Sequence, residues 1–305
     1  MIQNVTRLIA EKLALGDKWT SQIMLKPMGY DLLTNKFTIA ITSETGQTKK
    51  FIVKVSNGHN LNDLVQTEAN NIESLLNLRV EGVPPLIAHG LLEGRYFIAQ
   101  EFIVGRKPHS SKGTFDAAYE LASPWLGSLL SKTQGKTIDA ETILKRTEQF
   151  CKTTSEFFDV MDSTSLMEKL APKCEIPTYW AHGDFWHGNM LVDMKGKVWV
   201  TDYAFSAPEE PPIDVLDFIS DYEPWVFLSK EKLGKYTARF VPREINPLFL
   251  VLYLLNRKIA LKVREKTRLY DELLSLNLSS ELASVGEAGI LRDIIGGLQR
   301  DVYQN

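Results

Sequence analysis

Two segments decide how this sequence is interpreted: His182-Gly183-Asp184-Phe185-Trp186-His187-Gly188-Asn189 and, shortly after it, Val200-Thr201-Asp202-Tyr203. A carboxylate on a tight loop, such as Asp184, can orient a substrate hydroxyl and accept its proton. The carboxamide of Asn189 and the carboxylate of Asp202 are hard oxygen ligands of the kind that Mg²⁺ prefers. A metal held in this way neutralises charge on a transferring phosphoryl group. The pattern therefore predicts phosphoryl transfer.

Upstream of these segments, the sequence predicts a small antiparallel sheet with one helix. Apolar residues alternate over 36–42 and 50–55, on either side of turn residues at 43–47, which is typical of a β-hairpin. Helical spacing over 61–77 predicts the helix that follows. Further elements are an amphipathic helix over 1–15 and strand candidates at 23–26, 86–90 and 96–102.

Residues 103–108, Ile-Val-Gly-Arg-Lys-Pro, predict a break between two lobes. The expected architecture is α+β and bilobal. It has an N-terminal lobe over 1–103, with the small sheet, and a larger, mostly helical C-terminal lobe over 104–305. The predicted helices of the second lobe are 114–131, 139–161, 212–227, 246–266 and 281–303, interrupted by strand-like runs at 190–192 and 198–201.

Composition excludes several other classes of protein. The 305 residues include 35 Lys and Arg against 38 Asp and Glu, a net charge of −3, whereas proteins that bind a nucleic-acid backbone usually carry a strongly basic domain. The longest apolar run, 248–255, is far shorter than the roughly 20 residues of a membrane span, and residues 1–16 lack the apolar stretch of a signal peptide. We therefore expect a cytoplasmic protein that binds neither nucleic acid nor membrane. Cys151 and Cys174 are expected to be reduced thiols, with a single disulfide left open.

The spaced set His182-Gly183-Asp184-x₄-Asn189 and Asp202 resembles the catalytic core of the aminoglycoside phosphotransferase and choline kinase family. Its members are small-molecule kinases with a protein-kinase-like fold. The resemblance implies that Asp184 is the catalytic base, that Asn189 and Asp202 bind Mg²⁺, and that His182 braces the loop from behind. A metal-ligand role for His182 or His187 is the competing interpretation, which the preference of Mg²⁺ for oxygen disfavours.

The resemblance also implies a lysine and an acidic partner in the N-terminal lobe. Lys54, in the alternating strand Phe51–Val55, resembles the lysine that contacts the α- and β-phosphates of ATP. Glu68, on the predicted helix that follows, resembles the partner that forms an ion pair with this lysine. Asp63 and Glu73 lie on the same helix and compete for that role.

Two further roles are implied by position. Backbone groups near Glu101 and Ile103, in Gln100-Glu101-Phe102-Ile103, correspond to those that bind the adenine. The segment Pro211–Phe218 resembles the acidic stretch that supports the catalytic loop, and Asp217 is favoured for that role. For Asp214, capping of the helix N-terminus is an equal alternative.

The sequence departs from the family pattern in places. The predicted phosphate loop, 26–35, holds a single glycine, so the choice between ATP and GTP stays open. Ala204 and Phe205 stand where the family often has an acidic residue and a glycine, which puts in doubt any extra carboxylate at the site. Gly183 replaces the arginine typical of protein kinases, and only a short interval separates Asp202 from Asp214. Both features favour a small substrate over a protein.

The expected activity is therefore an ATP- and Mg²⁺-dependent transfer of the γ-phosphoryl group to a hydroxyl of a small molecule: an aminoglycoside, a sugar or an amino alcohol. Acidic residues between 209 and 223 could attract a polycationic aminoglycoside, or could form a solvated loop and helix cap. A catalytically inactive nucleotide-binding pseudokinase and a protein kinase are the alternatives. The presence of the base and both metal ligands argues against the first.

Overall fold

The computed structural model describes residues 1–15, 18–24, 34–108, 115–154 and 163–273. Contacts between Cα atoms divide the chain into two compact units, and each unit contains two stretches of sequence. The first unit consists of Met1–Pro108 and Gly188–Ser206, and the second of His109–His187 and Ala207–Asn305. Gly188–Ser206 therefore groups with the N-terminal part of the chain, and the lobe boundary after residue 103 stays a prediction.

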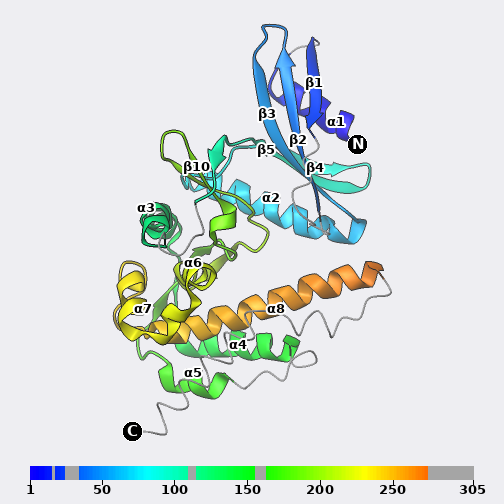
Figure 1. The fold of residues 1–305 in the computed structure, drawn as a ribbon. Helices are drawn as coiled ribbons and strands as arrows, with labels where there is room; N and C mark the ends of the chain where they lie inside the picture. Colours follow the sequence, from blue (N-terminus) through cyan, green and yellow to red (C-terminus); the bar gives the residue numbers. More distant parts are fainter. Residues whose placement is uncertain (16–17, 25–33, 109–114, 155–162, 274–305) are drawn as a thin grey trace. The chain divides into compact units, whose positions relative to one another are not determined.

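The first unit is built on a five-stranded antiparallel sheet with the order β1-β2-β3-β5-β4 (Figure 1). Its strands β2 and β3 form the hairpin that the alternating apolar residues predict. In the connecting turn, Gly46 has a φ of +78°, which glycine adopts without a steric penalty. The strands are β1 (Trp19–Met24), β2 (Thr34–Ser43), β3 (Thr48–Ser56), β4 (Leu86–Leu92) and β5 (Arg95–Glu101).

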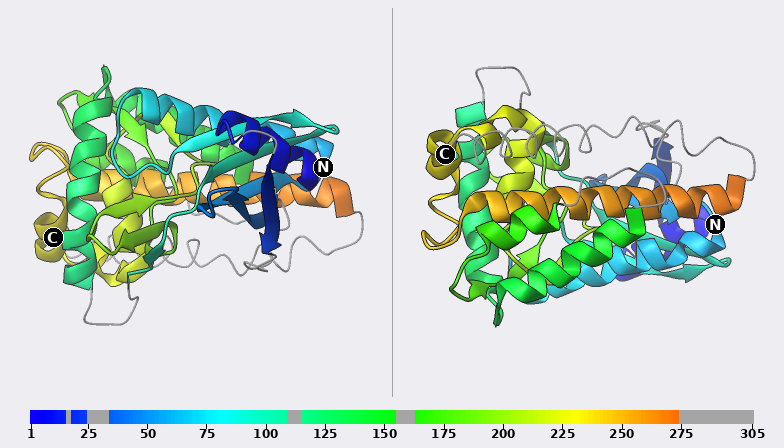
Figure 2. Two further views of the ribbon diagram at one scale, coloured as in Figure 1. Left: turned by 90° about the horizontal axis from the view of Figure 1, so that it is seen from above. Right: turned by 90° about the horizontal axis from the view of Figure 1, so that it is seen from below.

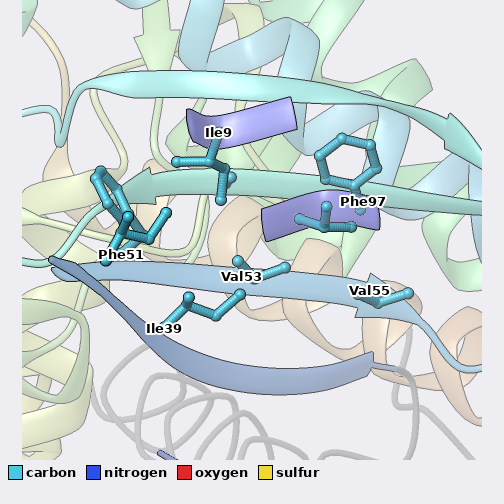
Figure 3. Packing of buried hydrophobic residues seen from close by; sticks show 9 residues of the cluster. Ile9, Ile39, Phe51, Val53, Val55 and Phe97 are labelled. Carbon is cyan, nitrogen blue, oxygen red and sulfur yellow. The ribbon is translucent and has the colours of Figure 1, made fainter. Parts of the chain in front are cut away.

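Two helices, α1 (Ile2–Lys12) and α2 (Asn62–Asn77), pack against this sheet, and a 3₁₀ turn, η1 (His59–Leu61), precedes α2. Successive side chains of a strand face opposite sides. Phe51 and Val53 of β3 therefore join Ile9 of α1 in the apolar core (Figure 3). By the same alternation, Lys54 faces the other side of the sheet. Each fully buried side chain of this size contributes about 1.5–3 kcal/mol, so the core fixes the direction in which Lys54 points.

A small hairpin completes the first unit. It consists of β10 (Met190–Asp193) and β11 (Val198–Val200), and β6 (Gly105–Arg106) pairs with β10. The N–H of Val200 donates to the carbonyl of Gly82, 2.8 Å away. Asn189 and Asp202, which flank the hairpin in sequence, are thereby placed in the same unit as Lys54.

The second unit is mainly helical. The apolar run 248–255 lies in α8 and is buried throughout, as expected of a helix that is hydrophobic on all sides. Helix α8 runs alongside α4 (Figure 2). The helices are α3 (Phe115–Thr133), α4 (Ala140–Thr154), α5 (Thr164–Leu170), α6 (Asp214–Tyr222), η3 (Pro224–Leu228), α7 (Lys230–Thr237) and α8 (Pro247–Leu273). Short strands pair β7 (Thr137–Ile138) with β8 (Ile176–Pro177), and β9 (Tyr179–Ala181) with β12 (Ala207–Glu210).

The α+β class with a small antiparallel sheet is confirmed. Two differences concern short elements. The strand predicted at 23–26 is the longer β1, and α5 and α7 were not predicted because seven and eight residues give too few turns for hydrophobic spacing to be recognised. The helix predicted over 281–303, and most of the loop at 26–35, lie outside the described residues. Among the helices that the structure describes, none has the length and apolar character needed to cross a bilayer.

Candidate active site

Lys54 is held between two carboxylates of the first unit. Its ammonium donates to Glu68 of α2 at 2.5 Å and to Asp202 at 3.1 Å. The side chains of Lys54 and Glu68 are only 10% and 3% exposed. Asp63 and Glu73, the competing acidic residues of α2, are exposed. The structure therefore brings Lys54, Glu68 and Asp202 together.

A second lysine, which was not predicted from the sequence, contacts the same carboxylate. Lys36 of β2 donates to Oδ2 of Asp202 at 3.1 Å, while Lys54 contacts Oδ1. The hairpin register places Lys36 directly opposite Lys54. The pair could have been predicted, because counting residues outward from the turn at 43–47 along both strands places Lys36 opposite Lys54.

These charges shift the pKa values of the cluster. Burial by itself would lower the pKa of Lys54, but the carboxylates of Asp202 and Glu68 overcome that effect and raise it. Desolvation by itself would raise the pKa of Asp202, and the ammonium groups of Lys54 and Lys36 instead hold it well below its usual range. Burial raises the pKa of Glu68, and Lys54 opposes the rise. The cluster therefore keeps Lys54 charged and Asp202 ionised at neutral pH.

The backbone around Asp202 is held in an unusual conformation. Asp202 has a φ of +71°, a region that non-glycine residues seldom occupy. The side-chain amide of Asn71, on α2, donates to the carbonyls of Tyr203 at 3.0 Å and Ser206 at 2.8 Å. Asn71 lies three residues after Glu68, so the two share one face of the helix. Helix α2 thus both supplies the partner of Lys54 and fixes the segment after Asp202.

Asn189 lies beside this segment. Its side chain is buried, and its main-chain carbonyl accepts the N–H of Thr201 at 2.9 Å, so Asn189 and Asp202 come from neighbouring stretches of chain. A carboxamide and a carboxylate are a donor set that fits Mg²⁺, which takes few protein ligands and completes its shell with phosphate oxygens and water. Among the described residues there is no cluster of three or more His, Cys, Asp or Glu side chains suited to a metal.

The predicted catalytic loop, residues 182–187, belongs to the second unit and is fixed by its backbone. The N–H groups of His182 and Gly183 donate to Asp214 at 2.7 and 3.0 Å, and the N–H of Phe185 donates to Asp217 at 2.7 Å. Both carboxylates come from the first turn of α6 and are buried. The cap position of α6 is Ile213, and the carboxylate of Asp214 instead accepts the loop N–H groups. Burial raises the pKa of Asp214.

Helix α8 supports the same loop from further along the chain. Lys258 pairs with Asp217 at 2.5 Å, and Arg257 donates to the carbonyl of Gly183 at 3.2 Å and to Glu210 at 3.3 Å. Neither cation was predicted from the sequence. Two consecutive basic residues, separated from the apolar run 248–255 by Asn256 alone, were the available signal.

Packing leaves Asp184 between two buried neighbours. Phe185 is fully buried and stacks on Trp125 of α3 at a centroid distance of 4.9 Å. The N–H of Asp184 donates to Nδ1 of buried His182 at 3.3 Å, and the Asp184 side chain is half-buried. Nδ1 of His187 lies 2.5 Å from Asp221. These contacts account for one ring nitrogen of each histidine without a metal.

The residues expected to bind adenine lie where β5 ends. Glu101 is the last residue of β5 and is exposed, and its N–H donates to the carbonyl of Pro85 at 3.0 Å. Ile103 lies two residues further on, outside any helix or strand, and is half-buried. Their role toward a nucleotide stays a prediction.

The chain, whose sheet unit and helical unit each carry one of these groups of residues, has a protein-kinase-like fold. The resemblance to the aminoglycoside phosphotransferase and choline kinase family is confirmed at the level of the fold. No family model matches the chain, and no curated protein matches it in sequence. The likeness is thus visible in the structure.

Three solved structures illustrate it. Choline kinase LicA from Streptococcus pneumoniae has a TM-score of 0.56 and 13% identity, over 96% of this chain and 98% of that chain. Spectinomycin phosphotransferase, in complex with ADP and spectinomycin, has a TM-score of 0.51 and 16% identity, over 92% and 93%. The GDP and kanamycin complex of APH(2″)-IIIa has a TM-score of 0.51 and 13% identity, over 99% of each chain.

Proposed function

We propose that this protein is an ATP- and Mg²⁺-dependent O-phosphotransferase that moves the γ-phosphoryl group to a hydroxyl of a small molecule. One observation carries the proposal: the ammonium of Lys54 is fixed between the carboxylates of Glu68 and Asp202. Phosphoryl transfer is catalysed mainly by positioning and charge neutralisation, and this lysine–glutamate pair is the part that holds the phosphates in protein kinases. The ADP and GDP complexes of the structural neighbours support a purine nucleotide and leave the base open.

In this proposal Asp184 accepts the proton of the acceptor hydroxyl. The hydroxyl oxygen forms a bond to the γ-phosphorus, the bond from that phosphorus to the bridging oxygen breaks, and the nucleoside diphosphate leaves with the electron pair. The hydrogen bonds from the loop backbone to Asp214 and Asp217 hold Asp184 in place before substrate binds, so little reorganisation is needed during the reaction.

Asn189 and Asp202 are the residues that would hold Mg²⁺, which neutralises charge on the phosphates when bound. Lys54 adds a fixed positive charge from β3. Because Lys54 and Asp202 also contact each other, the phosphate-binding lysine and the metal ligand are positioned as one group.

The acceptor is proposed to be a sugar or an amino alcohol. The acidic run that could attract a polycationic aminoglycoside is largely engaged within the second unit. Glu210 contacts Arg257 and the hydroxyl of Tyr253, and Asp214 and Asp217 hold the catalytic loop. Charges that are already paired attract a polycation weakly, which favours a smaller or less charged acceptor.

The alternatives make different demands on the same residues. A pseudokinase needs no base, yet Asp184 is placed on a loop held by two buried carboxylates. A protein kinase needs a long peptide-docking segment after the metal ligand, and here β12 begins directly after Ser206 and α6 follows at Asp214. Both observations favour transfer to a small molecule.

Release of ADP from ATP, measured with Mg²⁺ against a panel of sugars, amino alcohols and amino-sugars, tests the function. We expect at least one acceptor to stimulate release, and Asp184→Asn to abolish the stimulation while nucleotide binding persists. Asp63→Asn, which changes an exposed aspartate of α2, is the matched control and should keep full activity. Stimulated turnover in the Asp184→Asn protein would refute the role of the base.

A further inference from the structure

Lys36 and Lys54 approach Asp202 from two neighbouring strands. They are cross-strand partners in the β2–β3 hairpin, and each ammonium lies 3.1 Å from a different oxygen of Asp202. The Asp202 side chain is 30% exposed. Both oxygens of the proposed metal ligand are therefore already in contact with a cation.

The two lysines are not equivalent. Lys54 has a second carboxylate, Glu68, at 2.5 Å, and its side chain is 10% exposed, whereas the side chain of Lys36 is 25% exposed. Movement of Lys54 would separate a buried ion pair, which is strongly unfavourable. Movement of Lys36 returns a partly exposed ammonium to solvent or to another anion. Because its side chain is the more exposed of the two, Lys36 is the cation that can leave Asp202 at lower cost.

The charges of the cluster indicate what would displace Lys36 from Asp202. Lys36, Lys54, Glu68 and Asp202 together carry two positive and two negative charges. A free divalent cation at Asp202 would add two positive charges beside two ammonium groups, and close like charges repel strongly away from bulk water. A nucleotide polyphosphate arriving with the cation brings the compensating negative charge and offers Lys36 a new partner.

We propose that Lys36 acts as a stand-in cation on Asp202, so that a divalent metal binds there weakly on its own and tightly only together with nucleotide. The inference rests on the proposed function and assigns a regulatory part to a residue of β2. Metal and nucleotide then strengthen each other's binding, and by linkage the strengthening is equal in both directions. Removal of the Lys36 charge weakens that coupling, because Oδ2 of Asp202 becomes open to free metal.

Mn²⁺, followed by its paramagnetic resonance signal, is a suitable probe for nucleotide-free protein. We expect Lys36→Met to bind Mn²⁺ at least tenfold more tightly than the wild type, and Lys36→Arg to remain close to the wild type because the charge is kept. Lys50→Met is the matched control, since Lys50 is an exposed lysine of β3 and its loss should leave Mn²⁺ affinity unchanged. Adding Asp202→Asn to Lys36→Met should remove the gain, which shows that the metal binds at Asp202.

A second measurement follows the coupling itself. The affinity for a fluorescent ADP analogue is compared with and without Mn²⁺, and the ratio should fall at least fivefold in Lys36→Met. Lys36→Gln repeats both measurements with a polar side chain, and circular dichroism confirms that each variant is folded. Failure of folded Lys36→Met and Lys36→Gln to bind Mn²⁺ more tightly than the wild type, including a result with no detectable binding in any of them, overturns the inference.

The two hypotheses fail separately. If the wild type releases ADP in response to an acceptor while Lys36→Met gains no Mn²⁺ affinity, the stand-in role is wrong and the phosphotransferase function stands. If Mn²⁺ affinity rises as expected but no acceptor stimulates ADP release, the metal site is real and the proposed reaction is wrong.

Discussion

The ammonium of Lys258 lies 2.5 Å from the carboxylate of Asp217, and their side chains are 12% and 1% exposed. Asp217 also accepts the N–H of Phe185, so one buried carboxylate joins α8, α6 and the catalytic loop. A buried charge that loses its partner destabilises a protein far more than an exposed one does.

Lys258→Met should therefore lower the free energy of unfolding by about 3–5 kcal/mol, measured by urea denaturation. The double variant Lys258→Met with Asp217→Asn should recover part of this loss, because the amide oxygen of asparagine still accepts the N–H of Phe185 and no charge is left unpaired. A double variant no more stable than the single one would show that the pair is not a coupled unit.

Arg257 holds the carbonyl of Gly183, the residue before Asp184. Arg257→Met should reduce turnover by about 100-fold, a loss typical of a small misplacement of a catalytic group, while nucleotide affinity changes little because Lys54 and Asp202 belong to the other unit. Arg239→Met, which removes an exposed arginine paired with Glu120, is the control. Equal losses of turnover and of nucleotide affinity in Arg257→Met would contradict a role confined to the loop.

Asn71 is predicted to hold Asp202 through the segment that follows it. Asn71→Leu removes the donor to the carbonyls of Tyr203 and Ser206 and should lower the free energy of unfolding by about 1–3 kcal/mol. Asn71→Asp has nearly the same shape but places a carboxylate against two carbonyls, and it should be at least as destabilising. Isothermal titration with Mg²⁺ and ADP should show weaker binding in both variants. Unchanged binding would mean that Asp202 keeps its position without Asn71.

The depressed pKa of Asp202 predicts acid sensitivity. A carboxyl whose pKa is lower in the folded chain stabilises the fold above its unfolded pKa, about 3.9, and this contribution is lost as the pH falls through the folded value. The difference in unfolding free energy between the wild type and Asp202→Asn should therefore be constant above about pH 5 and should shift against the wild type as the pH is lowered further. Circular dichroism with urea from pH 6 downward measures it, and a difference that does not depend on pH would contradict the ion pairs with Lys36 and Lys54.

Sequence patterns predicted the features that depend on a single strand or helix. The alternation around Phe51, Val53 and Val55 is required because one face of β3 is buried, and the same alternation placed Lys54 on the opposite face. Glu68 was predicted from the resemblance to the kinase family, with Asp63 and Glu73 as competitors on the same helix, and the structure places the side chains of Lys54 and Glu68 in contact.

The remaining contacts depend on chain segments that meet only after folding. Arg257 reaches Gly183 across 74 positions of sequence, and Asn71 reaches Tyr203 across 132. The hydrophobic periodicity of one segment cannot predict such long-range contacts, because each contact depends on how several elements pack together. Asp214 was identified as a candidate but its task was left open, since a carboxylate in the first helical turn suits a cap and a loop brace equally well.

The division of the first unit into Met1–Pro108 and Gly188–Ser206 has a consequence for how the protein is made. During synthesis, Lys54 and Glu68 leave the ribosome well over a hundred residues before Asp202, so for much of translation the buried ammonium faces Glu68 alone. The charge of the lysine in the N-terminal sheet is balanced fully only after the β10–β11 hairpin and Asp202 have been synthesised. A fragment ending at residue 108 would carry the same defect permanently, and co-expression with a second fragment that begins after it would be needed to restore the balance.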